Sequence, residues 1–342
     1  MSQADLTSPH TTALVFTRTP ARWSVVAGVL LVGAAFLGSV ALPLATYAGT
    51  LALFGFAHVV SEMRFVDQRY GARLRGRLGW WLLAPLAVAL AARAAGTFGE
   101  LPSRVTVAVE LAAGAAMLMA VTAIAPRRRL LVATFGAALL AGAVLAPIHT
   151  LLALAVAHNF TPLAFLADTV EPRRRRSVMT GALLLFLGGP LLIASGLPYA
   201  VLAEAGLAAP ELSPFAGVTL YANLPIYVPR EAVDQVWAVH AFSAAVFAQC
   251  LHYMAVILVL PRLARREGPP LVRWPRPWVF FAALATVSAA LATAYGLDFN
   301  GARRLYAFAA LLHSWIEIPL LALALALVGG GAVRASASSA TR

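Results

Sequence analysis

Long apolar stretches recur along the whole chain and are separated by short polar segments. Most are close to the 20 or so residues that an α-helix needs to cross a hydrocarbon core about 30 Å thick. The fifth and sixth stretches meet at Pro147, and we separate them there because together they exceed one span and proline interrupts a helix. We therefore predict ten membrane-spanning helices, at about residues 23–46, 49–66, 79–98, 105–125, 130–147, 148–168, 177–203, 235–261, 276–295 and 304–328.

This pattern predicts one all-α domain, a polytopic transmembrane helix bundle over residues 23–329. Residues 1–22 are expected to form a cytoplasmic N-terminal tail, and the Ser- and Ala-rich residues 330–342 a disordered cytoplasmic tail. The segment at about 204–234 is the longest predicted outer loop, either a lid at the membrane surface or an interfacial connector.

Composition supports a membrane location. The 342 residues are 61% hydrophobic and only 12% charged, whereas soluble domains carry about 25% charged residues. No polar stretch is long enough to fold as a separate soluble domain. We expect a multi-pass integral membrane protein, in the bacterial cytoplasmic membrane.

The formal net charge of +12 comes from arginine, because the chain contains no lysine. The arginines gather in alternate loops, as topology signals do, and by the positive-inside rule both termini are cytoplasmic. We therefore do not expect a nucleic-acid partner. One pair departs from the alternation, since Arg303 and Arg304 fall on the predicted outer side. The single cysteine, Cys250, excludes an intrachain disulfide and a cysteine-based zinc or iron–sulfur site.

Six of the seven histidines lie in apolar stretches, where an ionised side chain costs about 2.5–3.5 kcal/mol or more. Two pairs, His58 with Glu62 and His313 with Glu317, are spaced four residues apart, which places each pair on one face of a helix. Four of the predicted helices run in the same direction and bring a set of such side chains to similar depth. The candidate metal ligands are His58, Glu62, His158, His252, His313 and Glu317.

His149 and His240 are further candidate ligands, nearer the outer surface. Four polar neighbours are candidates for orienting the imidazoles: Ser61, Asn159, Gln249 and Tyr253. Imidazole and carboxylate together favour Fe, Zn or Mn, whereas Cu(I) usually takes Met or Cys. The expected cofactor is one or two Fe ions, with Zn, Mn or Cu as alternatives.

A metal at mid-membrane depth is most accessible to molecules dissolved in the lipid. The leading hypothesis is a non-haem iron oxygenase or oxidase that acts on a lipid, an isoprenoid or another hydrophobic small molecule. Its partners would be membrane lipid, this substrate and, if reducing equivalents are needed, an electron-donor protein.

One helix carries a local resemblance to a known family. Phe242-Ser243, Phe247 and Leu251-His252-Tyr253 resemble a stretch of the Brp/Blh-type membrane β-carotene dioxygenases. This resemblance implies an iron-dependent oxygenase reaction in the membrane on a carotenoid-like substrate. The clustered histidine boxes of common membrane fatty-acid desaturases do not occur in this sequence.

Two other functions use the same residues. Histidine pairs can ligate haem in a membrane redox protein. However, His240 and His252 are 12 residues apart and His149 and His158 are 9 apart, less than the spacing usual in di-haem bundles. Alternatively, the His and Glu residues can carry protons or metal ions in a transporter.

Overall fold

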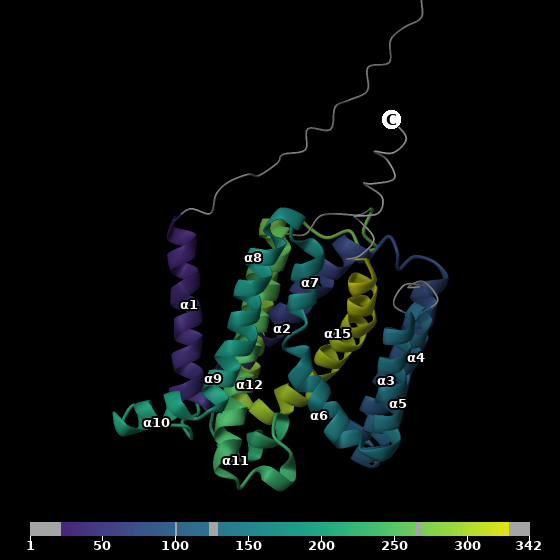
Figure 1. Cartoon of the computed structure of the whole chain (residues 1–342). Coiled ribbons are helices and arrows are strands. Elements are labelled where there is room, and N and C mark those ends of the chain that lie inside the picture. The colour runs from purple at the N-terminus through teal and green to yellow at the C-terminus, as the bar shows by residue number, and fades with distance from the viewer. Residues whose placement is uncertain (1–21, 100, 123–128, 264–267, 328–342) are drawn as a thin grey trace, which may run out of the picture.

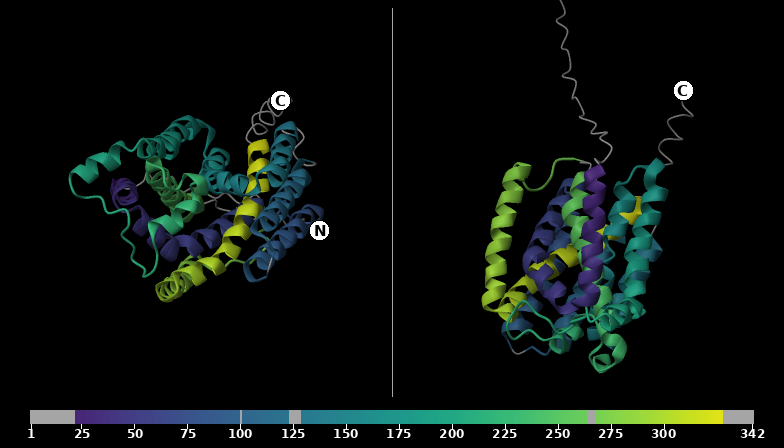
Figure 2. Two further views of the ribbon diagram at one scale, coloured as in Figure 1. Left: turned by 90° about the horizontal axis from the view of Figure 1, so that it is seen from below. Right: turned by 90° about the vertical axis from the view of Figure 1, so that its left-hand side faces the viewer.

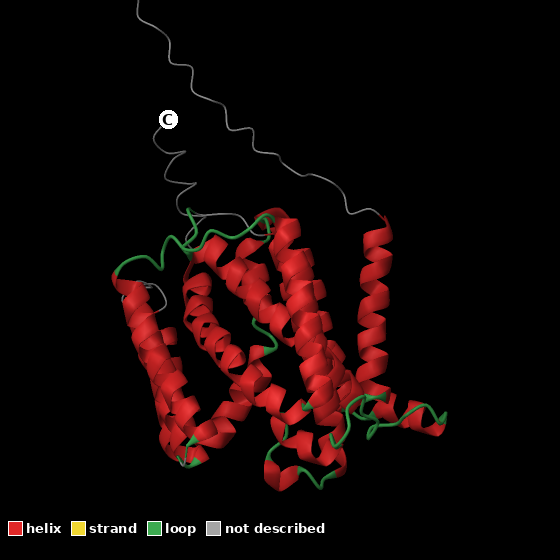
Figure 3. Cartoon of the chain, turned by 180° about the vertical axis from the view of Figure 1, so that it is seen from behind, coloured by secondary structure: helices red, strands yellow, loops and turns green. Residues whose placement is uncertain are grey.

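The computed structural model describes residues 22–99, 101–122, 129–263 and 268–327, and every regular element in these ranges is helical (Figure 3). Nearly all of both predicted tails therefore lies outside the described residues. The helical content follows from apolar runs in which every backbone N–H and C=O is satisfied within the helix, as a membrane requires.

Seven helices are long and apolar enough to cross a membrane. They are α2 (Pro43–Tyr70), α3 (Arg77–Phe98), α4 (Ser103–Thr122), a continuous segment from α8 to α9 (Pro172–Ala194), another from α12 to α13 (Val236–Leu263), α14 (Pro277–Leu297) and α15 (Phe299–Leu327). A bent pair, α6 (Pro147–His158) and α7 (Pro162–Thr169), meets at 42° and makes the count eight if it is one span. This content indicates an integral membrane protein.

The predicted count of ten spans is not confirmed by length and composition. The two remaining predicted spans correspond to shorter apolar stretches, Val25–Ala41 within α1 (Arg22–Ala41) and α5 (Arg129–Leu145). The predicted break at Pro147 is confirmed, because α5 ends at Leu145 and α6 begins at Pro147.

Several predicted boundaries are wrong, among them the start of the second span, which is Pro43 instead of residue 49, and the ends of the first and seventh spans. The first span ends at Ala41 instead of residue 46, because Pro43 lacks the N–H that would continue α1 and instead starts α2. The seventh span ends at Ala194 instead of residue 203. Gly196 follows with a φ of 76°, which turns the chain into the separate helix α10 (Leu197–Glu204). The loop beyond it carries only α11 (Leu220–Asn223) and two short 3₁₀ turns, Leu224–Ile226 and Arg230–Ala232.

The helices form two groups joined by α15. Helices α3, α4 and α5 pack side by side at one edge of the bundle, while α12 packs against α1, α2 and α9 (Figure 1). Helix α15 contacts α2, α3, α4 and α14 and runs obliquely across the bundle (Figure 2). The four helices that carry the candidate ligands, α2, α6, α12 and α15, therefore surround a common centre.

The two ends of the bundle differ in charge. One end, here called the Arg-rich face, carries the loops at residues 71–76 and 268–276 and the first residues of α8, and α1 begins and α15 ends near it (Figure 1). Asp67 stabilises this face by accepting hydrogen bonds from the backbone N–H groups of Leu271 and Val272 and from Trp274 Nε1. Asp168 likewise accepts hydrogen bonds from Arg69 Nε and the Tyr70 hydroxyl. The other end, the opposite face, carries residues 146–149, 224–234 and 298–304.

The orientation predicted from the arginine pattern can be tested with single cysteines, because the native Cys250 is buried. We expect Asp234→Cys, on the opposite face, to react with a membrane-impermeant maleimide in intact cells. Arg174→Cys, on the Arg-rich face, should react only after lysis. Labelling in the reverse order would contradict cytoplasmic termini.

Candidate metal centre

Four histidines from four helices meet inside the bundle. His58 lies on α2, His158 at the end of α6, His252 on α12 and His313 on α15. One ring nitrogen of each lies within 4.8 Å of one ring nitrogen of every other. Each residue separately sits in an apolar helix, so their convergence is a property of the tertiary structure.

Backbone hydrogen bonds fix the ring orientation of two of these histidines. His58 Nδ1 lies 3.3 Å from the carbonyl oxygen of Phe54, and His313 Nδ1 lies 3.2 Å from that of Ala309. A carbonyl oxygen can only accept, so each Nδ1 carries the proton and each neutral ring keeps a free lone pair on Nε2. Both lone pairs point to the centre of the cluster.

The distances between these nitrogens match those of ligands on one metal ion. His58 Nε2 lies 3.3 Å from His313 Nε2, which lies 3.1 Å from His158 Nε2. Neighbouring ligands at metal–nitrogen distances of about 2.0–2.1 Å are separated by about 2.8–3.4 Å in octahedral or tetrahedral geometry. Facing lone pairs at this distance repel each other unless a cation lies between them. The cluster therefore fits a metal ion.

The two predicted carboxylates lie beside the histidines. Glu317 Oε2 is 2.7 Å from His158 Nδ1, and Glu62 Oε2 is 3.6 Å from His252 Nε2. Both carboxyl groups are only 1% exposed and interact with each other. None of their oxygens has a well-aligned hydrogen-bond donor among the described residues. A buried carboxyl group with this deficit is stabilised by a positive charge nearby or by taking up a proton.

The contact of Glu317 gives it a specific role. A histidine that binds a metal through one nitrogen commonly donates its other N–H to a carboxylate, which fixes the ring. In His158, Nε2 faces His313 and Nδ1 lies 2.7 Å from Glu317 Oε2, a close contact that is not aligned as a hydrogen bond. Direct coordination by Glu62 or Glu317 remains a prediction.

The four polar neighbours occupy different positions. Tyr253 stacks on His58 with ring centroids 4.2 Å apart. Gln249 accepts a 2.6 Å hydrogen bond from the Tyr227 hydroxyl, and Asn159 donates to the Ala155 carbonyl at 3.3 Å. Ser61 is buried, and its hydroxyl makes no hydrogen bond within the described part of the chain.

His149 and His240 fall outside the four-histidine cluster. His149 forms an exposed pair with Glu231, at 2.5 Å, on the opposite face. The backbone N–H of Glu231 and the His149 ring hold the pKa of that carboxyl below its usual range. His240 lies beside Tyr199, with ring centroids 5.2 Å apart.

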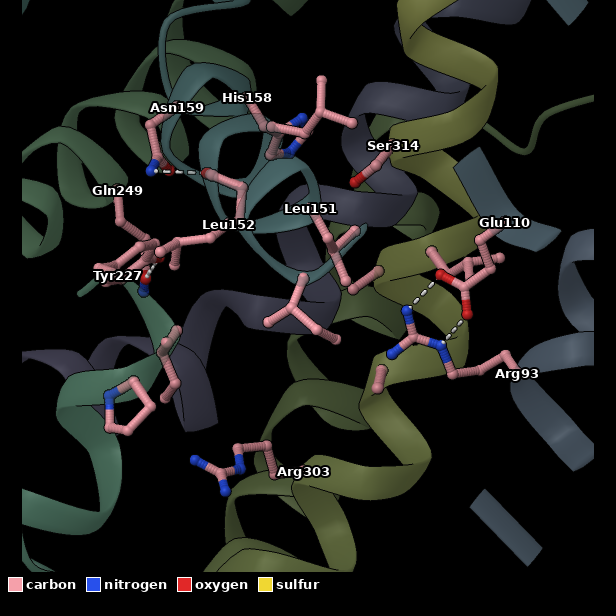
Figure 4. Close-up of a pocket in the computed structure, with 18 of the residues that line it drawn as sticks. Arg93, Glu110, Leu151, Leu152, His158, Asn159, Tyr227, Gln249, Arg303 and Ser314 are labelled. Carbon is pink, nitrogen blue, oxygen red and sulfur yellow. Dashed lines mark hydrogen bonds and ion pairs between the residues drawn. The ribbon is translucent and has the colours of Figure 1, made fainter. Parts of the chain in front are cut away.

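A cavity of about 790 Å³ connects the histidine cluster with the opposite face. All four clustered histidines line it, together with apolar side chains of α6 and α15. Figure 4 shows His158 at one end and Arg303 toward the other, with Leu151 and Leu152 between them. A cavity of this size can hold a drug-sized molecule.

Several residues that line this cavity were not singled out as site residues from the sequence. Tyr227 and Tyr306 lie in its wall, where Tyr306 is near Tyr253. A tyrosine in an apolar run gives no distinctive signal. Arg303 did give one, because it breaks the alternation of arginine-rich loops.

A tight contact positions the α15 ligands. Trp315, between His313 and Glu317, packs against Gly114 of α4. A Cβ at position 114 would lie 2.0 Å from the indole ring. Only glycine therefore allows α15 to approach α4 this closely.

No protein-family model, no curated protein and no solved structure matches this chain. Its class follows from its own fold and site. The chain is a helical membrane protein with a group of four histidines, three of them buried and His158 partly buried, that can hold a metal ion.

The role of Glu317 can be separated from that of the histidines by substitution. We expect His58→Ala or His313→Ala to abolish metal binding, because each removes an Nε2 at the centre. Glu317→Gln should weaken metal affinity by about 10–100-fold, since it removes only the charge that orients His158. Metal titration of purified protein measures both effects, with Glu204→Gln as an exposed control. Full metal affinity in His58→Ala would contradict the site.

The contact at Gly114 predicts a packing effect on the same site. Gly114→Ala should destabilise the protein by about 1–3 kcal/mol, as overpacking does, and lower its metal occupancy. Gly136→Ala is a matched control, because a Cβ there meets its nearest atoms at an ordinary 3.8 Å. Thermal unfolding in detergent and metal analysis measure the two effects. Equal behaviour of the two variants would contradict the role of this contact.

Proposed function

We propose that this protein is a membrane-embedded non-haem iron oxygenase or oxidase that acts on a lipophilic substrate. The observation that carries the proposal is a four-histidine cluster at the inner end of a largely apolar cavity. A metal ion at this position would be accessible to a molecule that enters the cavity. Lipids, isoprenoids and carotenoid-like molecules belong to the proposed substrate class.

The donor set supports iron more than copper. The cluster offers imidazole nitrogens with two adjacent carboxylates and, within the described residues, no cysteine or methionine among its ligands. Such hard and borderline donors suit Fe, Mn or Zn. A bound iron ion would supply dioxygen activation. Two carboxylates beside four histidines also allow a second ion, as in di-iron helix bundles.

The protein's own residues would prepare this chemistry. The carbonyls of Phe54 and Ala309 and the carboxylate of Glu317 hold three imidazoles with their Nε2 atoms directed inward. Apolar side chains such as Leu151 and Leu154 line the approach to the cluster. Tyr253, stacked on His58, is a hydroxyl-bearing side chain close to the centre.

The haem alternative receives less support from the geometry. A haem held by two axial histidines must fit its flat macrocycle between their rings. The Nε2 atoms of His58 and His313 are 3.3 Å apart, and the other two histidines lie within 4.8 Å. This arrangement favours a single ion over a macrocycle.

Elemental analysis with a visible spectrum tests the proposal. Detergent-purified protein is expected to contain one or two Fe per chain without a haem Soret band. It should consume dioxygen when a membrane-soluble substrate and, if required, an electron donor are supplied. His313→Ala should lack both iron and this activity.

Two results would contradict the proposal. A Soret band would favour the haem alternative. Metal-dependent flux across proteoliposomes, with no dioxygen consumption, would favour the transporter.

A further inference from the structure

A guanidinium group is held at the end of the cavity away from the histidines. Arg303 Nη1 donates to Asn223 Oδ1 at 2.6 Å and also contacts the Tyr47 hydroxyl. Asn223 is buried and is itself fixed by a 2.7 Å hydrogen bond to the Thr219 carbonyl. Arg303 is therefore a fixed, half-buried cation that lines the cavity (Figure 4).

The charge around this end of the cavity is not balanced. Five arginines and two glutamates line the cavity: Arg93, Arg104, Arg230, Arg303 and Arg304, with Glu110 and Glu231. Glu110 forms a two-fold pair with Arg93, at 2.7 and 2.6 Å, and Glu231 pairs with His149. The other four arginines show no carboxylate partner within the described residues. The cavity therefore presents excess positive charge near the opposite face.

Helix α15 connects this charge to the histidine cluster along one of its faces. Arg303, Tyr306, Ala310 and His313 are spaced three or four residues apart, and all four line the cavity. The ten residues from Arg303 to His313 correspond to a rise of about 15 Å. Between the two ends the wall is mostly apolar, with Ala307, Ala310 and Leu311 from α15.

We propose that the cavity binds an amphipathic anion, with its carboxylate or phosphate group on Arg303 and Arg304 and its apolar body along α15. The planar guanidinium forms strong, directional hydrogen bonds with such oxyanions. The inference rests on the proposed function in taking this anion as the substrate, whose far end then reaches the histidines. It also accounts for the exception that Arg303 and Arg304 make to the charge pattern.

A lipid headgroup could form the same hydrogen bonds with arginine, but it would bind at the membrane surface and not inside the cavity. Arg304 is exposed and could serve such a headgroup, whereas Arg303 is held inside the cavity by Asn223. A block between Arg303 and His313 separates the two cases. Ala310→Phe places a ring on the cavity wall and leaves both arginines unchanged.

The test measures binding of a long-chain carboxylate and of the alcohol of equal chain length to the purified full-length protein in detergent. Wild type should bind the acid at least about 10-fold more tightly than the alcohol. The double variant Arg303→Gln/Arg304→Gln should lose this preference and keep its affinity for the alcohol. Arg174→Gln, an exposed arginine of the Arg-rich face, should behave as wild type. Ala310→Phe should weaken binding of both molecules.

Three results would overturn the assignment: equal binding of acid and alcohol by wild type, an unchanged preference in the double variant, or full binding by Ala310→Phe. The last would place the acid at the surface. Iron content, measured separately, distinguishes this failure from failure of the proposed function. If His58→Ala loses iron but wild type shows no preference for the acid, the anion site is wrong and the metal centre is still supported. If wild type prefers the acid but His58→Ala keeps its iron, the metal centre is wrong and the anion site is still supported.

Discussion

The structure depends on polar nitrogens converging in an apolar bundle. At least three imidazole nitrogens face one another at separations of 3.1 and 3.3 Å, beside two carboxyl groups that are almost completely buried. Burying such groups without partners is unfavourable, and facing lone pairs add repulsion. A bound cation removes both penalties at once. A cation at this point would therefore stabilise the arrangement of the helices around the cluster.

Helix α15 links this centre to the rest of the molecule. It supplies a candidate ligand in His313, the orienting carboxylate in Glu317 and, ten residues before His313, the cation at the other end of the cavity. Trp315 against Gly114 sets its distance from α4. One continuous helix thus fixes the spacing between the charged end of the cavity and the metal centre, which would set the length of molecule that fits.

The sequence predicts the parts of the site that depend on local geometry. His58 with Glu62, and His313 with Glu317, share helix faces because a four-residue spacing does so on any α-helix. The shared depth of the histidines also follows from the positions of the apolar runs. The turn at Gly196 was not predicted, because the apolar run continues through a glycine whose conformation depends on its surroundings.

Contacts between helices are the part that the sequence leaves open. Tyr253 stacks on His58, whereas Gln249, one turn earlier on α12, bonds Tyr227. The rotation of α12 decides between such neighbours, and that rotation is set by packing against α1, α2 and α9. His149 likewise lies in an apolar run, yet it pairs with Glu231 of a distant loop. The spacing of residues along one helix does not predict these contacts between separate segments.

The central claim is that the four histidines bind one metal ion at a common point. X-ray absorption spectroscopy of the purified, iron-loaded protein tests it most directly, because imidazole rings give a characteristic multiple-scattering pattern. The account predicts nitrogen and oxygen ligands at about 2.0–2.2 Å with several imidazoles and no sulfur. A spectrum with only oxygen ligands, or one unchanged in His58→Ala, would contradict it.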